Sequence, residues 1–210
     1  MNEFSAISNT SVAEFAKRIS DVFDLDASFI EKVELMDEAF DDEPKIDFLR
    51  EVFFDLLMIN FFAEDVKKLE EDYLDTAEWE AIEEETIDRG TELLNVLLYL
   101  RECKDEDIEP ELEDFLKEFL LVEDDEFQDE HRIYEDVIAN QILMEASIEE
   151  IANVSNALPE SSDLKDMFYP IMGFFFQPEP GKEDREDYLK NSVDPEFDGV
   201  VYALLTSFYK

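Results

Sequence analysis

Negative charge dominates this chain, and it constrains what the chain can become more than any other feature. The 210 residues include 59 Asp and Glu but only 17 Lys and Arg, so the formal net charge is −42 at pH 7. A small domain stays soluble at a net charge of about 2 to 8 in magnitude, and a larger excess destabilises the compact state by self-repulsion. The excess therefore needs a physical reason, and the simplest one is a strongly basic binding partner.

The apolar content predicts a folded protein rather than a disordered acidic tail. Hydrophobic residues make up 45% of the chain, and they include 19 Phe, 7 Tyr and 1 Trp. At this length folding buries about 70% of the surface that the unfolded chain exposes, which offsets the loss of conformational entropy. Only 4 Gly and 7 Pro are present, a scarcity that suits helical proteins better than turn-rich β proteins.

Apolar residues recur at helical spacing through nearly the whole chain, and no segment has a convincing strand pattern. Five helix starts carry capping signals, at Ser11–Glu14, Ser28–Glu31, Thr76, Ser147–Glu150 and Asp194-Pro195. We therefore predict an all-α fold, a compact bundle of eight to ten helices that forms a single domain over residues 1–210. A sub-boundary near 122–130 would divide this bundle into two packed helical halves.

Three other residues predict where helices begin, bend or stop. We expect Pro44 at the first position of a long apolar helix that runs to about Leu74. Gly90 lies inside a predicted helix that continues to Leu98, and we expect the glycine to mark either a bend or a close crossing. Pro170 should kink or end the helix that contains it.

The acidic residues are unevenly distributed along the sequence. Residues 71–140 carry 27 acidic and 5 basic residues, net −22, whereas residues 1–70 and 141–210 carry net charges of −11 and −9. Adaptation to high salt would spread the charge and reduce both Lys and the bulky apolar residues, which is not the pattern here. The central helices also have few lysines to pair with glutamate, in contrast to ordinary solvated helix faces. We interpret the acidity as partner-driven.

The same charge excludes several classes of partner and location. An anionic membrane surface or bare nucleic acid would repel the chain, and no stretch approaches the roughly 18 apolar residues of a membrane span. The single cysteine, Cys103, cannot form an intrachain disulfide and indicates a reducing compartment. No secretory signal pattern is visible. We expect a cytoplasmic protein that binds neither membrane nor nucleic acid directly.

Catalytic motifs are scarce. His131 is the only histidine, which removes most general-base schemes, nucleophilic triads and zinc sites, so we predict no cofactor and no metal centre. One acidic pattern, Glu84-Glu85-Thr86-Ile87-Asp88 followed by Glu102-Cys103-Lys104-Asp105, resembles that of the all-α nucleotide pyrophosphatases of the MazG type. The resemblance implies that these acids bind magnesium, but no Lys or Arg cluster for nucleotide phosphates accompanies them.

We therefore predict a protein that works by binding rather than catalysis. An acidic face would dock on the cationic cleft of a nucleic-acid-binding protein, such as a nuclease, and exclude its substrate. DNA-mimicking anti-restriction and anti-CRISPR proteins and nuclease immunity proteins act in this way, and the resemblance to them is one of charge and helicity. The predicted partner-binding residues are Glu78, Glu83, Glu85, Asp88, Glu111, Glu113, Asp114, Glu118, Glu123, Asp124, Asp125 and Glu126.

Two alternatives remain open: an intracellular helical scaffold or adaptor, and a magnesium-dependent pyrophosphatase. The oligomeric state is not set by the sequence. The aromatic run Phe174–Phe176 lies beside the Pro/Gly loop 177–181. Neighbouring residues cannot all face inward on one helix, so part of this run could form an apolar anchor within a polar rim; packing in the core is the alternative for each phenylalanine.

Overall fold

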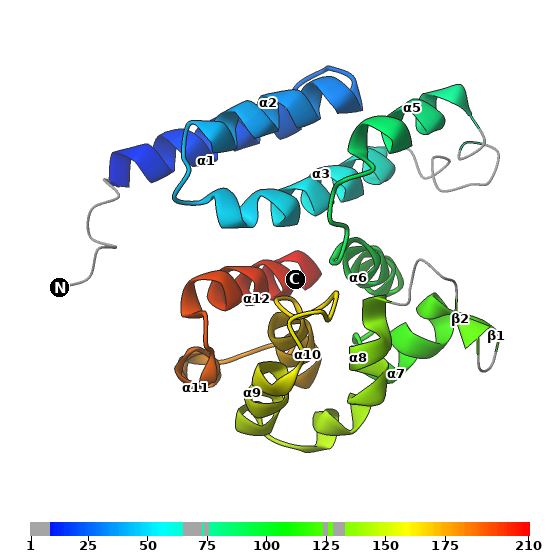
Figure 1. Ribbon diagram of the computed structural model, residues 1–210, viewed down its shortest axis with the longest axis vertical. Coiled ribbons are helices and arrows are strands. Elements are labelled where there is room, and N and C mark those ends of the chain that lie inside the picture. Colours follow the sequence, from blue (N-terminus) through cyan, green and yellow to red (C-terminus); the bar gives the residue numbers. More distant parts are fainter. Residues whose placement is uncertain (1–8, 65–72, 74–75, 124–125, 128–132) are drawn as a thin grey trace. The chain divides into compact units, whose positions relative to one another are not determined.

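The protein is seen in a computed structural model of residues 1–210, of which residues 9–64, 73, 76–123, 126–127 and 133–210 are described. The predicted all-α class is confirmed: 74% of the structure is helical, and nine of the 11 α-helices in this described part have seven or more residues (Figure 1). One short ribbon accompanies the helices. Strand β1 (Leu121–Glu123) pairs antiparallel with β2 (Glu126–Phe127), so that Leu121 lies opposite Phe127.

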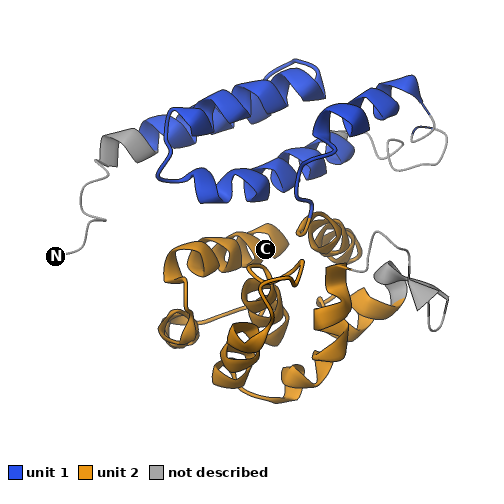
Figure 2. Ribbon diagram, in the orientation of Figure 1, with its two compact units in different colours: residues 1–91 blue, residues 92–210 orange. Residues whose placement is uncertain are grey.

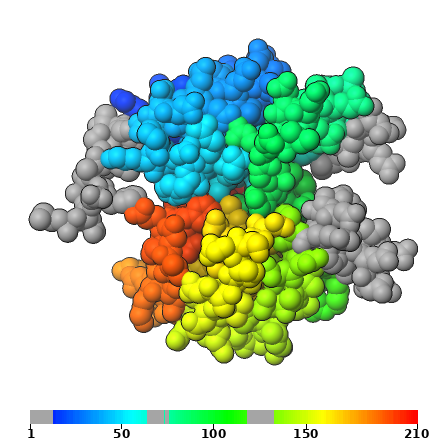
Figure 3. Space-filling view, in the orientation of Figure 1, coloured from blue at the N-terminus to red at the C-terminus, as the bar shows by residue number. Residues whose placement is uncertain are grey.

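The chain divides into two compact units, residues 1–91 and residues 92–210 (Figure 2). In the space-filling view, side chains close the spaces that the ribbons leave between the helices of each unit (Figure 3). The first unit has 27 acidic and 8 basic residues, net −19, and the second has 32 and 9, net −23. Both units therefore carry the charge excess. The predicted sub-boundary at 122–130 falls within the second unit and includes residues outside the described ranges, so it stays a prediction.

The first unit is built around α2. Its elements are α1 (Asn9–Phe23), α2 (Phe29–Asp41), the 3-10 helix η2 (Asp47–Leu49), α3 (Arg50–Glu64) and α5 (Ala77–Thr86). Helix α2 packs against α1, α3 and α5. Met36 and Phe40 of α2 and Phe54 of α3 are fully buried at its centre.

Helix α3 begins later than the sequence predicted. Residues 43–46 form a turn instead of a first helical turn at Pro44, with the Ile46 N–H donating to the Glu43 carbonyl at 3.0 Å. Arg50 explains the position of the start, because its guanidinium donates to Asp41 of α2 at 2.7 Å and to Asp47. These tertiary ion pairs fix the start of α3 beside the end of α2. The predicted end near Leu74 lies outside the described residues.

The predicted helix through Gly90 is two helices. Helix α5 ends at Thr86 and α6 begins at Leu94. Between them, the Gly90 N–H donates to the Glu51 carboxylate of α3 at 3.1 Å, which holds the connecting segment in a non-helical conformation.

The second unit surrounds α10. Its helices are α6 (Leu94–Glu106), α7 (Leu112–Asp114), the π-helix η4 (Phe115–Leu120), α8 (Glu135–Ala139), the 3-10 helix η6 (Gln141–Glu145), α9 (Ile148–Ala157), α10 (Phe168–Phe176), α11 (Lys182–Asn191) and α12 (Pro195–Tyr209). Residues 168–175 of α10 are all buried. Helices α8, α9 and α12 and the 3-10 helix η6 pack against it.

Helix starts with local capping chemistry follow the sequence prediction, as at Thr76, which caps α5, with one exception: α1 begins at Asn9, so Ser11 lies inside this helix and does not cap it. The Ser28 hydroxyl accepts from the Glu31 N–H at 3.3 Å, and the Glu31 carboxylate accepts from the Ser28 N–H at 3.0 Å. Ser147 caps α9, and Asp194 caps α12 with Pro195 in its first turn. The prediction that Pro170 kinks or ends its helix is wrong. Pro170 lies in the first turn of α10, where its missing N–H removes no intrahelical hydrogen bond.

A stack of three tyrosines supports α10. The ring centroids of Tyr169 and Tyr188 are 4.5 Å apart and those of Tyr188 and Tyr202 are 4.1 Å apart, with nearly parallel planes. Gly173 of α10 lies against this stack, because a Cβ atom there would be 2.5 Å from Tyr188 Cε2. Close approach of α10 to the stack therefore requires glycine at position 173.

One carboxylate of the second unit is buried beside the stack. Asp198 is 6% exposed and accepts a hydrogen bond from the Ser192 hydroxyl at 2.5 Å. Burial raises the pKa of Asp198 to about 6, because desolvation of the charged form outweighs the hydrogen bond from Ser192, which lowers it.

Candidate functional site

The predicted acids of the first unit are exposed around α5. Glu78, Glu83, Glu85 and Asp88 all lie on the surface, and within the described part of the chain none of them forms an ion pair. Glu78 and Glu85 are two turns apart, about 10 Å along the helix axis, and Glu83 lies about 140° round the helix from Glu78. Carboxylates thus flank both sides of the buried edge of α5, which is marked by Ile82.

The predicted acids of the second unit occupy different environments. Glu111 and Glu113 are exposed and Asp114 is half-buried. Glu118 lies in η4, and Glu123 and Glu126 lie in the ribbon; their side chains are outside the described part of the structure. Asp124 and Asp125 are not among the described residues.

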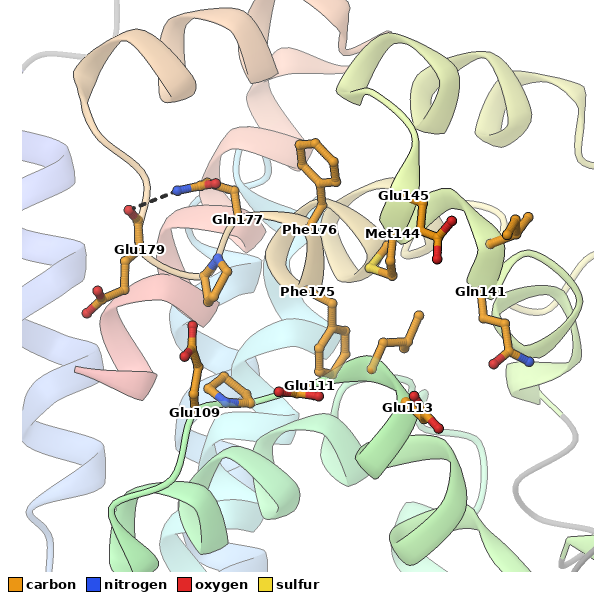
Figure 4. A pocket seen from close by; sticks show the side chains of 14 residues that line it. Glu109, Glu111, Glu113, Gln141, Met144, Glu145, Phe175, Phe176, Gln177 and Glu179 are labelled. Carbon is orange, nitrogen blue, oxygen red and sulfur yellow. Dashed lines mark hydrogen bonds between the residues drawn. The ribbon is translucent and has the colours of Figure 1, made fainter.

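Glu111 and Glu113 line a pocket of about 740 Å³ in the second unit (Figure 4). Three segments form its walls: residues 109–113 at α7, residues 141–145 of η6, and residues 175–179 at the end of α10. This volume lies in the range of roughly 300 to 1,000 Å³ that proteins use for ligand pockets. We call it the α7–α10 pocket.

The rim of the α7–α10 pocket is acidic. The fourteen residues that line it include no lysine, arginine or histidine, and its five glutamates are Glu109, Glu111, Glu113, Glu145 and Glu179. Lys117, one turn beyond Glu113, forms an ion pair with it. The hydrogen bond from Lys117 and its positive charge lower the pKa of Glu113. The other four glutamates have no ion-pair partner among the described residues, so the pocket presents a concentrated negative charge.

Apolar side chains also line the pocket. Phe175 is 7% exposed and lies between the α7 segment and the η6 segment, with Met144 on the opposite side from Glu111 (Figure 4). Phe176 is half-buried, and Ile142 is 68% exposed at the edge. In the run 174–176, Phe174 and Phe175 are buried in the core and Phe176 is half-buried, so the apolar anchor within a polar rim stays a prediction.

Buried tyrosines hold two of the pocket walls in place. The Tyr99 hydroxyl donates to the Glu111 carbonyl and accepts from the Glu111 N–H, both at 3.1 Å. The Tyr202 hydroxyl donates to the Gln177 carbonyl at 2.8 Å. Burial raises the pKa of Tyr99 above its usual value and that of Tyr202 to about 12. Both hydroxyls therefore stay protonated donors, and the walls are fixed before any ligand arrives.

Ring contacts in the core also hold Phe175 in place. Its ring stacks on Phe115, with centroids 5.5 Å apart, and the Tyr99 ring lies 6.2 Å away. Phe115 in turn packs edge-on against Tyr134, whose hydroxyl donates to the Glu92 carbonyl. The pocket floor is therefore part of the aromatic core of the second unit.

The sequence alone missed most of the pocket. Glu109, Glu145 and Glu179 were not selected, and neither were Ile142 and Met144. In the sequence, the loop 177–181 and the run of phenylalanines before it indicated that a binding surface could lie here. Their position beside α7 and η6 depends on long-range packing, which no local pattern encodes.

The described acids do not form a metal centre. No three His, Cys, Asp or Glu side chains in the described ranges are arranged to hold a metal ion. All acids of the pattern that resembles the pyrophosphatases lie in the described ranges, and they do not form a group that could hold a metal ion. The pyrophosphatase alternative therefore gains no support from their arrangement. Cys103 is buried, and burial raises its pKa, which disfavours a reactive thiolate. His131 lies outside the described residues.

No family model, curated protein or solved structure matches this chain. In the described ranges, every helix is too short or too polar to cross a bilayer.

Proposed function

We propose that this chain binds a strongly basic protein and occupies the cationic cleft in which that protein holds nucleic acid. The main support is the exposure of the predicted carboxylates on α5 and around the α7–α10 pocket without cations beside most of them in the described structure. Their charge is thus available to a partner. Opposite fields accelerate association, and the attraction weakens as salt screens it.

The amount of charge suits a substitute for nucleic acid. The net charge of −22 on residues 71–140 equals the phosphate charge of about eleven base pairs, if all of it faced outward. Along α5 the two-turn separation of Glu78 and Glu85, about 10 Å, corresponds to roughly three phosphate steps along one DNA strand. Occupancy of the cleft, rather than a chemical reaction, would then be the mechanism.

The composition of the pocket also favours binding over catalysis. Its lining offers carboxylates, the amides of Gln141 and Gln177, and apolar side chains. Serine, cysteine, threonine and lysine, which act as nucleophiles beside a base, are absent from the lining in the described structure, so its glutamates are the only lining residues there that could act as a nucleophile or as an acid–base pair.

The proposal is tested by capture followed by competition. The immobilised protein is incubated with host lysate at about 50 mM and about 500 mM NaCl, and retained proteins are identified by mass spectrometry. We expect a basic nucleic-acid-binding protein at low salt and little of it at high salt. The purified target should then release a labelled duplex when this chain is added.

Two variants with equal charge change separate local from global electrostatics. In the α5 variant, Glu78, Glu83 and Glu85 become Gln and Asp88 becomes Asn. In the control variant, four exposed acids in or after α1 become amides: Glu14, Asp21, Asp24 and Asp26. We expect the α5 variant to compete with the duplex at least about tenfold more weakly and the control to change less than about threefold. Absence of a basic target, or a target that keeps its duplex, would refute the proposal.

A further inference from the structure

We infer that the α7–α10 pocket receives an arginine-containing segment of the basic partner. The guanidinium group would lie among the rim glutamates, and a neighbouring apolar side chain would pack on Ile142 and Phe176. This inference rests on the proposed function and specifies which part of the partner the second unit recognises.

The charge of the pocket requires a cationic occupant. Five glutamates and no lysine, arginine or histidine line the pocket in the described structure, and Lys117, which is outside the lining, pairs with Glu113 of α7. The glutamates come from three separate segments and do not gather around one point that could hold a metal ion. A cation with a spread charge or several donors, held between the walls, matches this arrangement better than a single ion does.

The apolar surface requires more than a cation. Ile142 is 68% exposed at the pocket edge, and Met144 and Phe176 are each only half-buried beside it. Exposed apolar side chains within a charged rim are typical of the anchor points of protein interfaces. A peptide that carries an apolar residue next to its cation satisfies both surfaces at once (Figure 4).

Arginine fits this lining better than lysine. The guanidinium group is planar, weakly hydrated and able to stack on aromatic rings, and its fork of donors reaches carboxylates on two sides. Phe176, which is half-buried, supplies a ring, and Glu111 and Glu145 supply carboxylates from two different walls. The compact ammonium group of lysine is strongly hydrated and gains less from such a surface.

The pocket is preformed for this occupant. The hydroxyls of Tyr99 and Tyr202 fix the backbone of Glu111 and Gln177, one on each of two walls. A rigid receptor lowers the entropy cost of binding a short flexible segment. The volume of about 740 Å³ has room for several side chains rather than one.

The test is direct binding of a defined peptide to the full chain. A fluorescein-labelled peptide of sequence Gly-Ser-Arg-Leu-Arg-Ser-Gly is titrated with protein, and fluorescence anisotropy gives the affinity. Versions with both Arg replaced by Lys, or with Leu replaced by Ser, test the two parts of the recognition. We expect each replacement to weaken binding by about three- to tenfold.

Variants of the protein have matched controls. The pocket variant changes Glu111, Glu145 and Glu179 to Gln, and its control changes three exposed acids elsewhere in the second unit: Asp163→Asn, Glu183→Gln and Glu196→Gln. We expect about tenfold weaker peptide binding for the pocket variant and less than about twofold for the control.

The apolar contact has its own pair of variants. Ile142→Ala should weaken peptide binding by about threefold, whereas Ile87→Ala, which removes an 80% exposed isoleucine from the first unit, should leave it unchanged. All of the replaced side chains in these variants are exposed, so the far-UV circular dichroism should match that of the unmodified protein.

The outcomes separate this inference from the proposed function. Equal binding by the pocket variant and its control, or displacement of the peptide by spermidine at equal concentration, would overturn the inference, because charge alone would then explain binding. If such a result accompanies capture of a nucleic-acid-binding target through α5, the proposed function stands without the pocket. If the peptide binds as expected and no such target is captured, the pocket inference stands and the proposed function fails.

Discussion

Replacing Arg89 with methionine should destabilise the first unit by about 2 to 3 kcal/mol. Arg89 follows α5, and its guanidinium joins α2 to α3 by donating to Asp37 and, at 2.9 Å, to Glu51. It also lies over the Phe54 ring, 5.2 Å from the centroid. Burial lowers the pKa of Arg89, but the hydrogen bonds to Asp37 and Glu51 outweigh burial and leave it above its usual value.

The magnitude follows from these contacts. The Arg89 side chain is 16% exposed, whereas Asp37 and Glu51 are 30% and 40% exposed, so solvent screens both pairs in part. We assign about 1 kcal/mol to each pair, between the values for surface and for buried pairs. The cation–π contact adds about 0.5 to 1 kcal/mol. Methionine keeps the apolar stem of the side chain, so the loss of unfolding free energy measures the contribution of the guanidinium group.

Trp79 provides the assay. It is the single tryptophan of the chain, it lies on α5, and its ring centroid is 5.5 Å from that of Phe62 on α3. Its fluorescence during urea denaturation therefore reports the unfolding of the first unit. With a slope of about 1.5 kcal/mol per molar urea, the midpoint should fall by about 1 to 2 M.

A matched variant distinguishes the local contacts from the loss of one positive charge. Lys17 is exposed on α1, and Lys17→Met changes the net charge equally. Its midpoint should move by less than about 0.3 M. Equal shifts for the two variants would refute the reasoning, as would additive effects of Arg89→Met and Asp37→Asn, because a direct contact must give a coupling energy.

Two further predictions concern the second unit. Buried Asp198 has a pKa of about 6, against 3.8 for the ordinary carboxyl, so the folded state binds a proton that the unfolded state releases. The resulting contribution to stability falls by about 1 to 3 kcal/mol as pH rises from about 4 through 6. Asp198→Asn should remove this pH dependence, which urea unfolding followed by circular dichroism between about pH 5 and 7.5 would measure. If the pH dependence of stability persists in Asp198→Asn, it arises from other titratable groups. Gly173→Ala should cost about 1 to 3 kcal/mol because the new Cβ meets the Tyr188 ring at 2.5 Å, whereas the new Cβ of Gly199→Ala meets only the half-exposed Leu189 side chain, so this substitution should be neutral or stabilising. Thermal melts of the two variants, followed by circular dichroism, measure both effects. Equal melting temperatures would show that the tyrosine stack shifts freely.

The fold was predictable where local chemistry decides it. Ser28 with Glu31 and Asp194 with Pro195 supply their own hydrogen bonds to the helix N-terminus, so these helix starts depend on neighbours in sequence. Two features that sequence reasoning misplaced, the start of α3 and the break between α5 and α6, depend on distant residues. Arg50 fixes the start of α3 through Asp41 of α2, and Gly90 leaves the helix because Glu51 accepts its N–H.

The candidate site divides in the same way. Composition and helical periodicity determine that the chain is helical and strongly acidic and that Glu111 and Glu113 are exposed on an amphipathic segment, because burial of charge is costly wherever it occurs. Only the tertiary structure brings Glu145, Glu179 and Phe175 into the same pocket as these two residues. A pocket is a relation among segments that are distant in sequence, and packing around α10 brings them together.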